Sequence, residues 1–311
     1  MILELLQCIL MLAIAPLITG IIRKAKARVQ SRQGPSVLQP YRDLRKLLSK
    51  GSVVSNDTSW VFAIAPYVCI AAVVIAALLV PVLYAQTYGF VGDFIVLIYL
   101  LAMMRFFMAL SALDAGSTFG GMGASREMYI SSIVEPTMLL SIFAMALVAG
   151  TTSLGSISAI IASGGLDLVT PSLFLAAAAF FVATLAENAR VPFDNPATHL
   201  ELTMIHEAML LEYSGKQLAL MELSSMTKLV IFLAILSNVF FPWGIATGTS
   251  SLAIAAGLGA FLIKVVALAL LIALIESSIA KMRLFRLPNL LTVAFTLALL
   301  AVMSFYILGA T

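Results

Sequence analysis

Long apolar runs are the feature that most constrains the fold of this chain. A helix needs about 20 residues to cross the hydrocarbon core of a bilayer, and eight runs of the sequence approach that length. The chain is 62% hydrophobic and 11% charged, whereas a soluble domain is about half apolar and about a quarter charged. We therefore predict an all-α integral membrane protein with about eight transmembrane helices, at roughly residues 2–22, 60–83, 92–113, 128–149, 171–189, 216–241, 252–276 and 287–309.

Lys and Arg alternate between the loops that join these runs. Loop 23–59 is rich in both, and basic residues recur in the third, fifth and seventh loops, whereas 84–91, 150–170 and 242–251 contain neither. Basic loops stay in the cytoplasm, so this pattern places both termini outside and the large loops inside. We expect a single polytopic membrane domain over residues 1–311, joined outside by simple connectors. Its cytoplasmic loops 23–59, 114–127 and 190–215 would form a docking face.

Two of the cytoplasmic loops have further patterns. After Pro40, the leucines at 38, 44, 47 and 48 suit a short amphipathic helix, which could lie on the membrane or dock a soluble partner. The glycine-rich run AGSTFGGMGASRE lacks the lysine of a phosphate-binding loop. It predicts a flexible connection between the third and fourth spans.

Charged residues also occur inside the predicted spans. Arg105, Lys228 and Lys264 would each cost about 2.5–3.5 kcal/mol at the bilayer centre, so we expect each to face protein or water. The depth of Glu135 and Glu187 favours a water-filled path that can carry protons. Glu4 and Glu276 lie nearer to helix ends. A side chain there can reach the membrane interface or pair with a basic residue, and either would explain an acid at these positions.

Acidic residues concentrate between Glu187 and Lys216. This stretch holds five carboxylates and Arg190, and it also holds His199 and His206, the two histidines of the chain. His206 and Glu207 begin like a zinc-binding HExxH motif, but Leu210 occupies the place of the second histidine. The seven-residue spacing of the histidines is compatible with a proton relay or a metal pair on one helix face, but we favour two polar interfacial residues. Iron–sulfur clusters usually need four thiolates and the chain has two cysteines, so we predict no catalytic or metal site in this chain alone.

Several ordered motifs resemble one family. ARVQSRQGP and LQPYRDLRKLL in the first loop, GASRE with Glu135-Pro136, AENARVPFD and EYSG are similar to the NADH dehydrogenase subunit 1 family of respiratory complex I. The resemblance covers nearly the whole chain. It implies a proton path, to which we assign Glu135, Glu187, Arg190, Asp194, Glu201, Glu207, Glu212, Glu222, Lys228 and Lys264. It also implies docking of a soluble arm by Arg28, Arg32, Gly34, Pro35, Gln39, Pro40 and Asp43.

The departures from this family indicate a branch within it. Pro196 is kept, but Ala197 and His199 stand where quinone-reducing members have glutamates, and Glu201 alone remains of that triplet. The first loop is shortened at Ser36-Val37. The forms GPSVLQPYRDLRKLL and HLELTMIHEAMLLEYSGK resemble membrane-bound [NiFe] hydrogenases of the hydrogenase-4 and formate hydrogenlyase type.

This resemblance implies a subunit that is not catalytic on its own. It would anchor the soluble redox arm of an oxidoreductase complex in the prokaryotic cytoplasmic membrane and link electron transfer to proton or sodium translocation. The expected partners are hydrogenase-like large and small subunits, an iron–sulfur protein, antiporter-like membrane subunits and the lipid bilayer, without nucleic acid. A Ni–Fe centre and iron–sulfur clusters would reside in those partners. Two alternatives stay open: the quinone-binding subunit of an NADH-quinone oxidoreductase, with a cavity open to the bilayer between the first and fifth loops, and a stand-alone ion transporter.

Overall fold

The computed structural model describes residues 2–55, 57–85, 93–165, 170–194, 204–246, 248 and 250–308. Regular structure in these ranges is helical, apart from an isolated bridge between Tyr84 and Ala246. Short 3-10 turns lie at Glu207–Leu210 and Leu284–Arg286, and a π-helical turn at Leu236–Phe240. The α-helices are α1 (Ile2–Val29), α2 (Gln39–Ser49), α3 (Trp60–Leu79), α4 (Asp93–Asp114), α5 (Thr118–Ala149), α6 (Leu154–Gly164), α7 (Pro171–Glu187), α8 (Gly215–Ile235), α9 (Ser251–Ser278) and α10 (Leu287–Leu308).

The helices confirm the predicted all-α membrane fold. Seven helices in the described part of the chain are long and apolar enough to cross a membrane. The remaining predicted span corresponds to α7, a shorter apolar helix at Pro171–Glu187. The ends agree closely except at two places: α1 continues to Val29, about two turns past the predicted end, and α5 begins at Thr118, ten residues before the predicted start. The first basic residues of loop 23–59 therefore lie on a helix.

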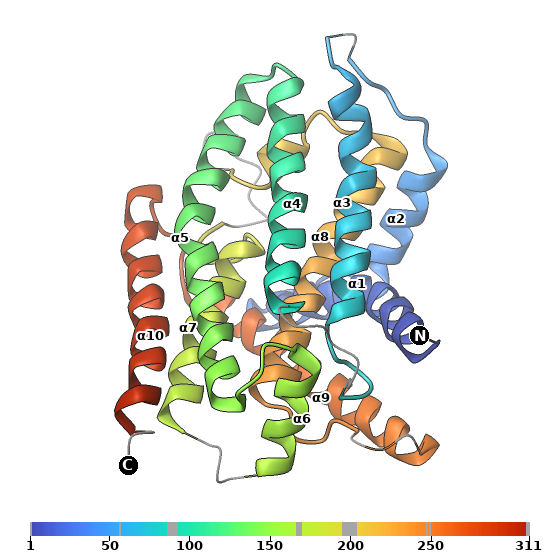
Figure 1. The fold of residues 1–311 in the computed structure, drawn as a ribbon. Coiled ribbons are helices and arrows are strands. Elements are labelled where there is room, and N and C mark those ends of the chain that lie inside the picture. The colour runs from blue at the N-terminus through green and yellow to red at the C-terminus, as the bar shows by residue number, and fades with distance from the viewer. Residues whose placement is uncertain are drawn as a thin grey trace.

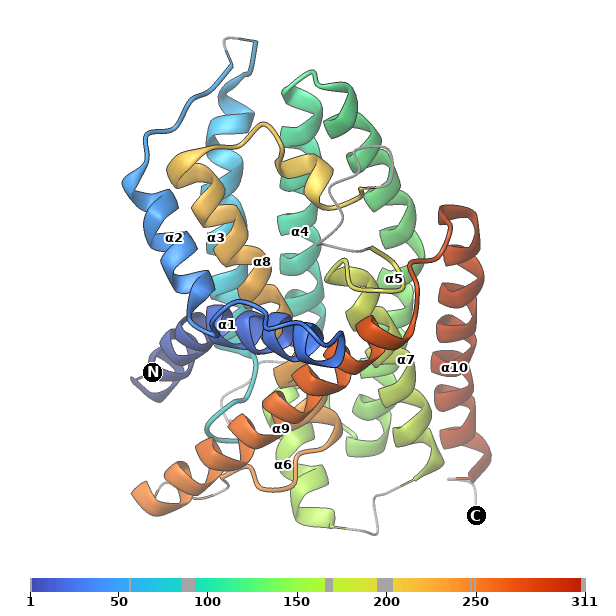
Figure 2. The ribbon, with the colours of Figure 1, turned by 180° about the vertical axis from the view of Figure 1, so that it is seen from behind.

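Two helices cross the others. Helices α3, α4, α5, α7, α8 and α10 run side by side, and α1 and α9 lie across them (Figure 1, Figure 2). Helix α1 packs against α8 and α9, and α10 covers α5 and α7. The ends of α1 and α9 therefore meet the segment that follows α7, where the acidic residues of the sequence concentrate.

The amphipathic helix predicted after Pro40 is α2. Pro40 occupies its first turn, where a missing N–H costs no hydrogen bond. Pro40 and Leu44 are buried, while Arg42, Arg45 and Lys46 are exposed. Since α2 packs against α1 and α8, its polar face points away from the bundle.

Two predicted connections are wrong. Most of the glycine-rich run at 115–127 is helical, because α5 begins at Thr118 and Ser117 caps it by accepting a hydrogen bond from the Gly120 amide. The connector at 150–170 contains α6, whose Leu154, Ile157 and Ile161 are buried on one face. In both segments, packing against neighbouring helices outweighs the weak helix propensity of Gly and Ser.

Candidate functional site

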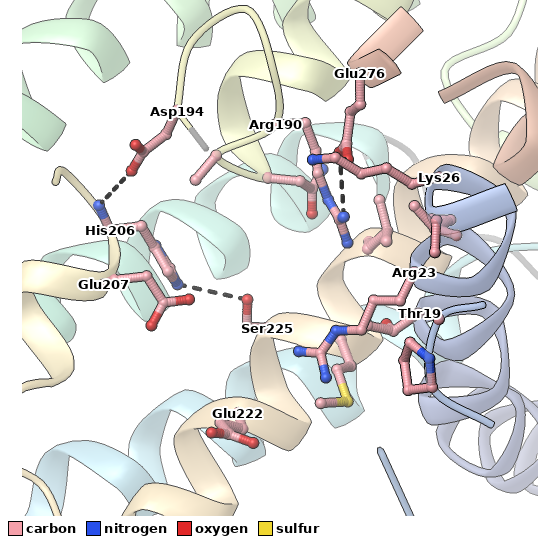
Figure 3. Close-up of a pocket in the computed structure, with 18 of the residues that line it drawn as sticks. Thr19, Arg23, Lys26, Arg190, Asp194, His206, Glu207, Glu222, Ser225 and Glu276 are labelled. Carbon is pink, nitrogen blue, oxygen red and sulfur yellow. Dashed lines mark hydrogen bonds and ion pairs between the residues drawn. The ribbon is translucent and has the colours of Figure 1, made fainter. Parts of the chain in front are cut away.

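A polar cavity lies where the crossing helices meet the bundle. It has a volume of about 650 Å³ and is bounded by α1, the chain up to Pro35, the segment after α7, the Glu207–Leu210 turn, α8 and the end of α9 (Figure 3). Its charged lining is mixed in sign: Arg23, Lys26, Arg32, Arg190, Asp194, Glu207, Glu222 and Glu276. The cavity therefore presents both cations and carboxylates between the first and fifth loops.

Ion pairs hold the cavity wall together. The buried carboxylate of Glu276 accepts hydrogen bonds from Lys26 Nζ and Arg190 Nη1, each at 3.2 Å. The sequence left two explanations for Glu276, reaching the membrane interface or pairing with a base, and the structure shows the pairing. Asp194 accepts hydrogen bonds from the backbone amides of Ile205 at 3.0 Å and His206 at 3.3 Å, and from Lys281 Nζ at 2.7 Å. The two carboxylates thus tie the segment after α7 to α1, to the chain after α9 and to the 204–210 segment.

His206 lies in this wall as a neutral imidazole. Its Nε2 is 3.4 Å from Ser225 Oγ (Figure 3), while Nδ1 is buried without a partner among the described residues. Burial lowers the pKa of His206 to about 4, and the positive charge of Lys228 acts in the same direction. The side chain therefore carries no charge at neutral pH.

A second group of charges is buried deeper among the helices. Arg105 on α4 forms ion pairs with Glu135 on α5 and Glu187 on α7. The other oxygen of Glu187 is 3.5 Å from Lys228 Nζ on α8. The side chains of Arg105 and Lys228 are 2% and 0% exposed, so both face protein as expected, whereas Glu135 is 34% exposed. We call Arg105, Glu135, Glu187 and Lys228 the buried charge group.

Helix α8 connects the cavity to the buried charge group. Glu222 and Ser225 line the cavity, and Lys228 follows at the same spacing of three residues. Residues three apart are neighbours on a helix surface, and the rise from Glu222 to Lys228 is about 9 Å. The polar side chains of α8 therefore lead from the cavity into the helix bundle.

Lys264 occupies a different environment. Its Nζ donates hydrogen bonds to Ser237 O at 2.7 Å, Asn238 Oδ1 at 2.8 Å and Phe241 O at 3.0 Å. These acceptors belong to the π-helical turn and the residue after it. Within the described chain, Lys264 therefore caps the end of the α8 segment, and its place on a proton path stays a prediction.

The other predicted path residues are dispersed. Glu207 and Glu222 face the cavity, whereas Glu212 is exposed just before α8. Glu201 lies outside the described residues, as do Pro196, Ala197 and His199.

The residues predicted to dock an arm lie at the end of α1, in the chain after it and in α2. Arg28 and Arg32 are exposed, and Gly34 and Pro35 line the cavity. A positive φ of 63° at Gly34 accounts for glycine there. In α2, Gln39 Nε2 donates to Asp43 Oδ1 at 2.8 Å, and Pro40 is buried. Of this set, Arg32, Gly34 and Pro35 line the cavity, and docking by these residues stays a prediction.

Sequence reasoning missed Glu127. This residue is 5% exposed on α5 and interacts electrostatically with Lys228, Glu187 and Arg105. It was overlooked because it ends the glycine-rich run that resembles a loop. Once both residues are placed on one helix, the position of Glu127 eight residues before Glu135 would have marked it as a candidate site residue.

Comparisons with known proteins agree with the fold. A family model described as NADH dehydrogenase matches residues 3–307. A chain in the structure of the membrane-bound sulfane sulfur reductase, an archaeal respiratory membrane complex, has a similar fold with a TM-score of 0.84 at 22% identity, covering 96% of this chain and 97% of that one.

Three relatives are similar in sequence. Formate hydrogenlyase subunit 4 of Escherichia coli K12 is 38% identical over 301 residues, which is 96% of this chain and 97% of that protein. Hydrogenase-4 component C of the same strain is 36% identical over 296 residues, or 95% and 92%. An NADH-quinone oxidoreductase subunit of Rubrobacter xylanophilus is 32% identical over 246 residues, or 74% and 71%. The chain therefore belongs to the NADH dehydrogenase family, as the motifs of its loops predict.

Proposed function

We propose that this chain is the membrane anchor and coupling subunit of a complex I-like membrane-bound [NiFe] hydrogenase in the prokaryotic cytoplasmic membrane. One observation carries the proposal. Two relatives named as hydrogenase or formate hydrogenlyase subunits are similar over 95% and 96% of the chain at 36% and 38% identity, whereas NADH-quinone oxidoreductase subunits match over 70% to 84% at 27% to 32% identity. The hydrogenase branch therefore accounts for more of this sequence.

In this proposal the redox chemistry belongs to partner subunits. Hydrogenase-like large and small subunits and an iron–sulfur protein would carry the Ni–Fe centre and the clusters on the cytoplasmic side. Antiporter-like membrane subunits would continue the ion path through the bilayer. In support, the two cysteines of this chain lie separately in α1 and α3, and two thiols are too few for a cluster.

Coupling would act through the charges between the cavity and the buried charge group. A redox change in the docked arm alters the charge or geometry beside the cavity. Buried carboxylates respond strongly to such changes, because a nearby charge or a change in hydration shifts their proton affinity. Glu222 and Ser225 lie on the cavity side of Lys228, and Lys228 faces Glu187. A proton or sodium ion would thus be driven along this axis.

Purification of the intact complex tests the proposal. The subunits that copurify with this chain would be identified, and their nickel, iron and flavin contents measured. Nickel with iron–sulfur clusters and hydrogen evolution is the expected result. Flavin together with NADH oxidation would overturn the hydrogenase proposal.

A second candidate function is quinone binding. The cavity of about 650 Å³ between the first and fifth loops favours it, because that alternative predicts a cavity at this place, open to the bilayer. Its mixed charged lining is less suited to an apolar ring and tail, since ligand pockets are mostly apolar with few polar groups. Reduction of a short-chain quinone by the purified complex, blocked by substituting Arg190 or His206, would support this candidate.

A further inference from the structure

Glu127 is a buried acid without a basic partner. It is 5% exposed and forms no hydrogen bond or ion pair with another residue in the described ranges. By contrast, Glu187 is paired with Arg105, Asp194 with Lys281, and Glu276 with Lys26 and Arg190. Glu127 therefore differs from the other buried acids of the site.

The packing of α5 places Glu127 between the cavity wall and the buried charge group. A Cβ on Gly123, one turn earlier, would lie 2.8 Å from Ile205 O and 2.9 Å from the Ala208 Cβ. This face of α5 therefore lies directly against the 204–210 segment, which carries His206. Residues i and i+4 share a helix face, so Glu127 lies beside that segment. Glu135 follows about 12 Å further along α5.

Burial favours a neutral Glu127, because removal from water penalises the charged carboxylate. The groups facing it are Lys228 from α8, Glu187 from α7, Arg105 from α4 and Asp194 from the segment after α7. In the buried charge group the two cations balance Glu135 and Glu187, and Asp194 is balanced by Lys281. An ionised Glu127 would add an uncompensated buried negative charge, which is costly.

Lys228 is suited to compensate Glu127 when it ionises. Lys228 Nζ is fully buried, has no hydrogen-bond partner among the described residues, and is 3.5 Å from Glu187 Oε2. Arg105 stays bonded to Glu187 through the other oxygen. The ammonium group can therefore turn toward Glu127 without leaving Glu187 unpaired.

We propose that Glu127 is the residue that stores and releases a proton between the cavity and the buried charge group, a role that rests on the proposed coupling function. At rest the carboxyl group of Glu127 holds the proton and Lys228 faces Glu187. On release, the proton passes from Glu127 to water in the cavity. The net charge of the site falls by one as the proton leaves, and Lys228, which keeps its three hydrogens, turns toward the new carboxylate and stabilises its negative charge.

Infrared spectroscopy of the intact complex tests this protonation directly. The carbonyl stretch of a protonated carboxylic acid is separate from that of a carboxylate. The Glu127→Gln variant is expected to lose one protonated-acid band, and Glu127→Asp to shift that band without removing it. Glu4→Gln, a matched loss of a carboxyl group at the start of α1, should keep it. A spectrum of Glu127→Gln identical to that of the unsubstituted complex would overturn the proposal.

Ion translocation separates this proposal from the proposed function. Glu127→Gln should keep turnover with an artificial electron donor and lose most of the translocation per turnover, with partial rescue by Glu127→Asp. If the unsubstituted complex translocates no ion, the coupling function fails, while the infrared band still decides the protonation of Glu127. Glutamine mimics the protonated acid, so failure of Glu127→Gln to assemble would also contradict a neutral Glu127.

Discussion

Lys264 shows how a single charge can stabilise an irregular helix end. The α8 segment ends in a π-helical turn, which leaves carbonyl groups without regular helical donors. The three hydrogens of the Lys264 ammonium match three acceptors, two carbonyls and the side chain of Asn238. Asn238 in turn donates to Pro81 O at 3.0 Å and Val82 O at 3.1 Å, so the capped turn also anchors the chain after α3.

Replacement of Lys264 by methionine is expected to destabilise the protein. The change keeps most of the side-chain volume but leaves buried acceptors unsatisfied, which costs about 1–3 kcal/mol in the free energy of unfolding. Thermal unfolding of the purified protein in detergent measures the loss. Lys216→Met on the exposed start of α8 is the control, and equal midpoints for the two variants would contradict the capping role.

His206 predicts a pH dependence of stability. Its pKa is about 4 in the folded protein, against about 6.5 in an unfolded chain. Below about pH 6.5 the unfolded state therefore gains a proton that the folded state does not bind until about pH 4. The free energy of unfolding is expected to fall as the pH decreases through this window. His206→Gln should flatten that part of the curve, whereas an unchanged slope would show that His206 is not buried as described.

At the scale of elements, hydropathy predicted the helices but not their charge pairs. An apolar run of sufficient length has few alternatives to a helix in a membrane, so the spans could be located from the sequence. Arg105 and Glu187 are 82 positions apart, and no local pattern joins residues at that distance. The glycine-rich start of α5 was predicted to be a loop because glycine weakens an isolated helix. In the folded protein, glycine also permits close packing between the helix and its neighbours.

Gly123 provides a test of that close packing. Alanine at this position would bring its Cβ within 3.0 Å of both Ile205 O and the Ala208 Cβ, so the 204–210 segment must shift. We expect Gly123→Ala to destabilise the protein by about 1–3 kcal/mol, as overpacking does. Gly121→Ala on the same helix is the matched control, because the nearest atom to its Cβ would be 4.0 Å away. Unfolding midpoints compare the two, and a stable Gly123→Ala would argue against the contact.

At the scale of the whole molecule, the structure places part of the predicted docking set, Arg32, Gly34 and Pro35, in the cavity wall. Helix α1 reaches past its apolar run, so that Lys26 pairs with Glu276 of α9, which also pairs with Arg190 from the segment after α7 (Figure 3). Arg28, near the end of α1, and Arg32, just after that helix, are exposed. A soluble arm bound there would lie directly over the cavity, which is the arrangement that coupling requires.

Charge reversal at the rim tests whether the arm binds there. Arg28 and Arg32 are exposed, and exposed charges contribute to association mainly through steering and salt-dependent attraction. Arg28→Glu and Arg32→Glu are therefore expected to reduce retention of the soluble subunits, with the largest deficit at low salt and a smaller one as salt is raised. Salt shortens the screening length from about 8 Å at physiological ionic strength to about 3 Å at 1 M. Arg283→Glu, on an exposed loop outside the predicted docking face, should retain the arm. An arm that stays attached to the double variant through high salt would place the interface elsewhere on the molecule.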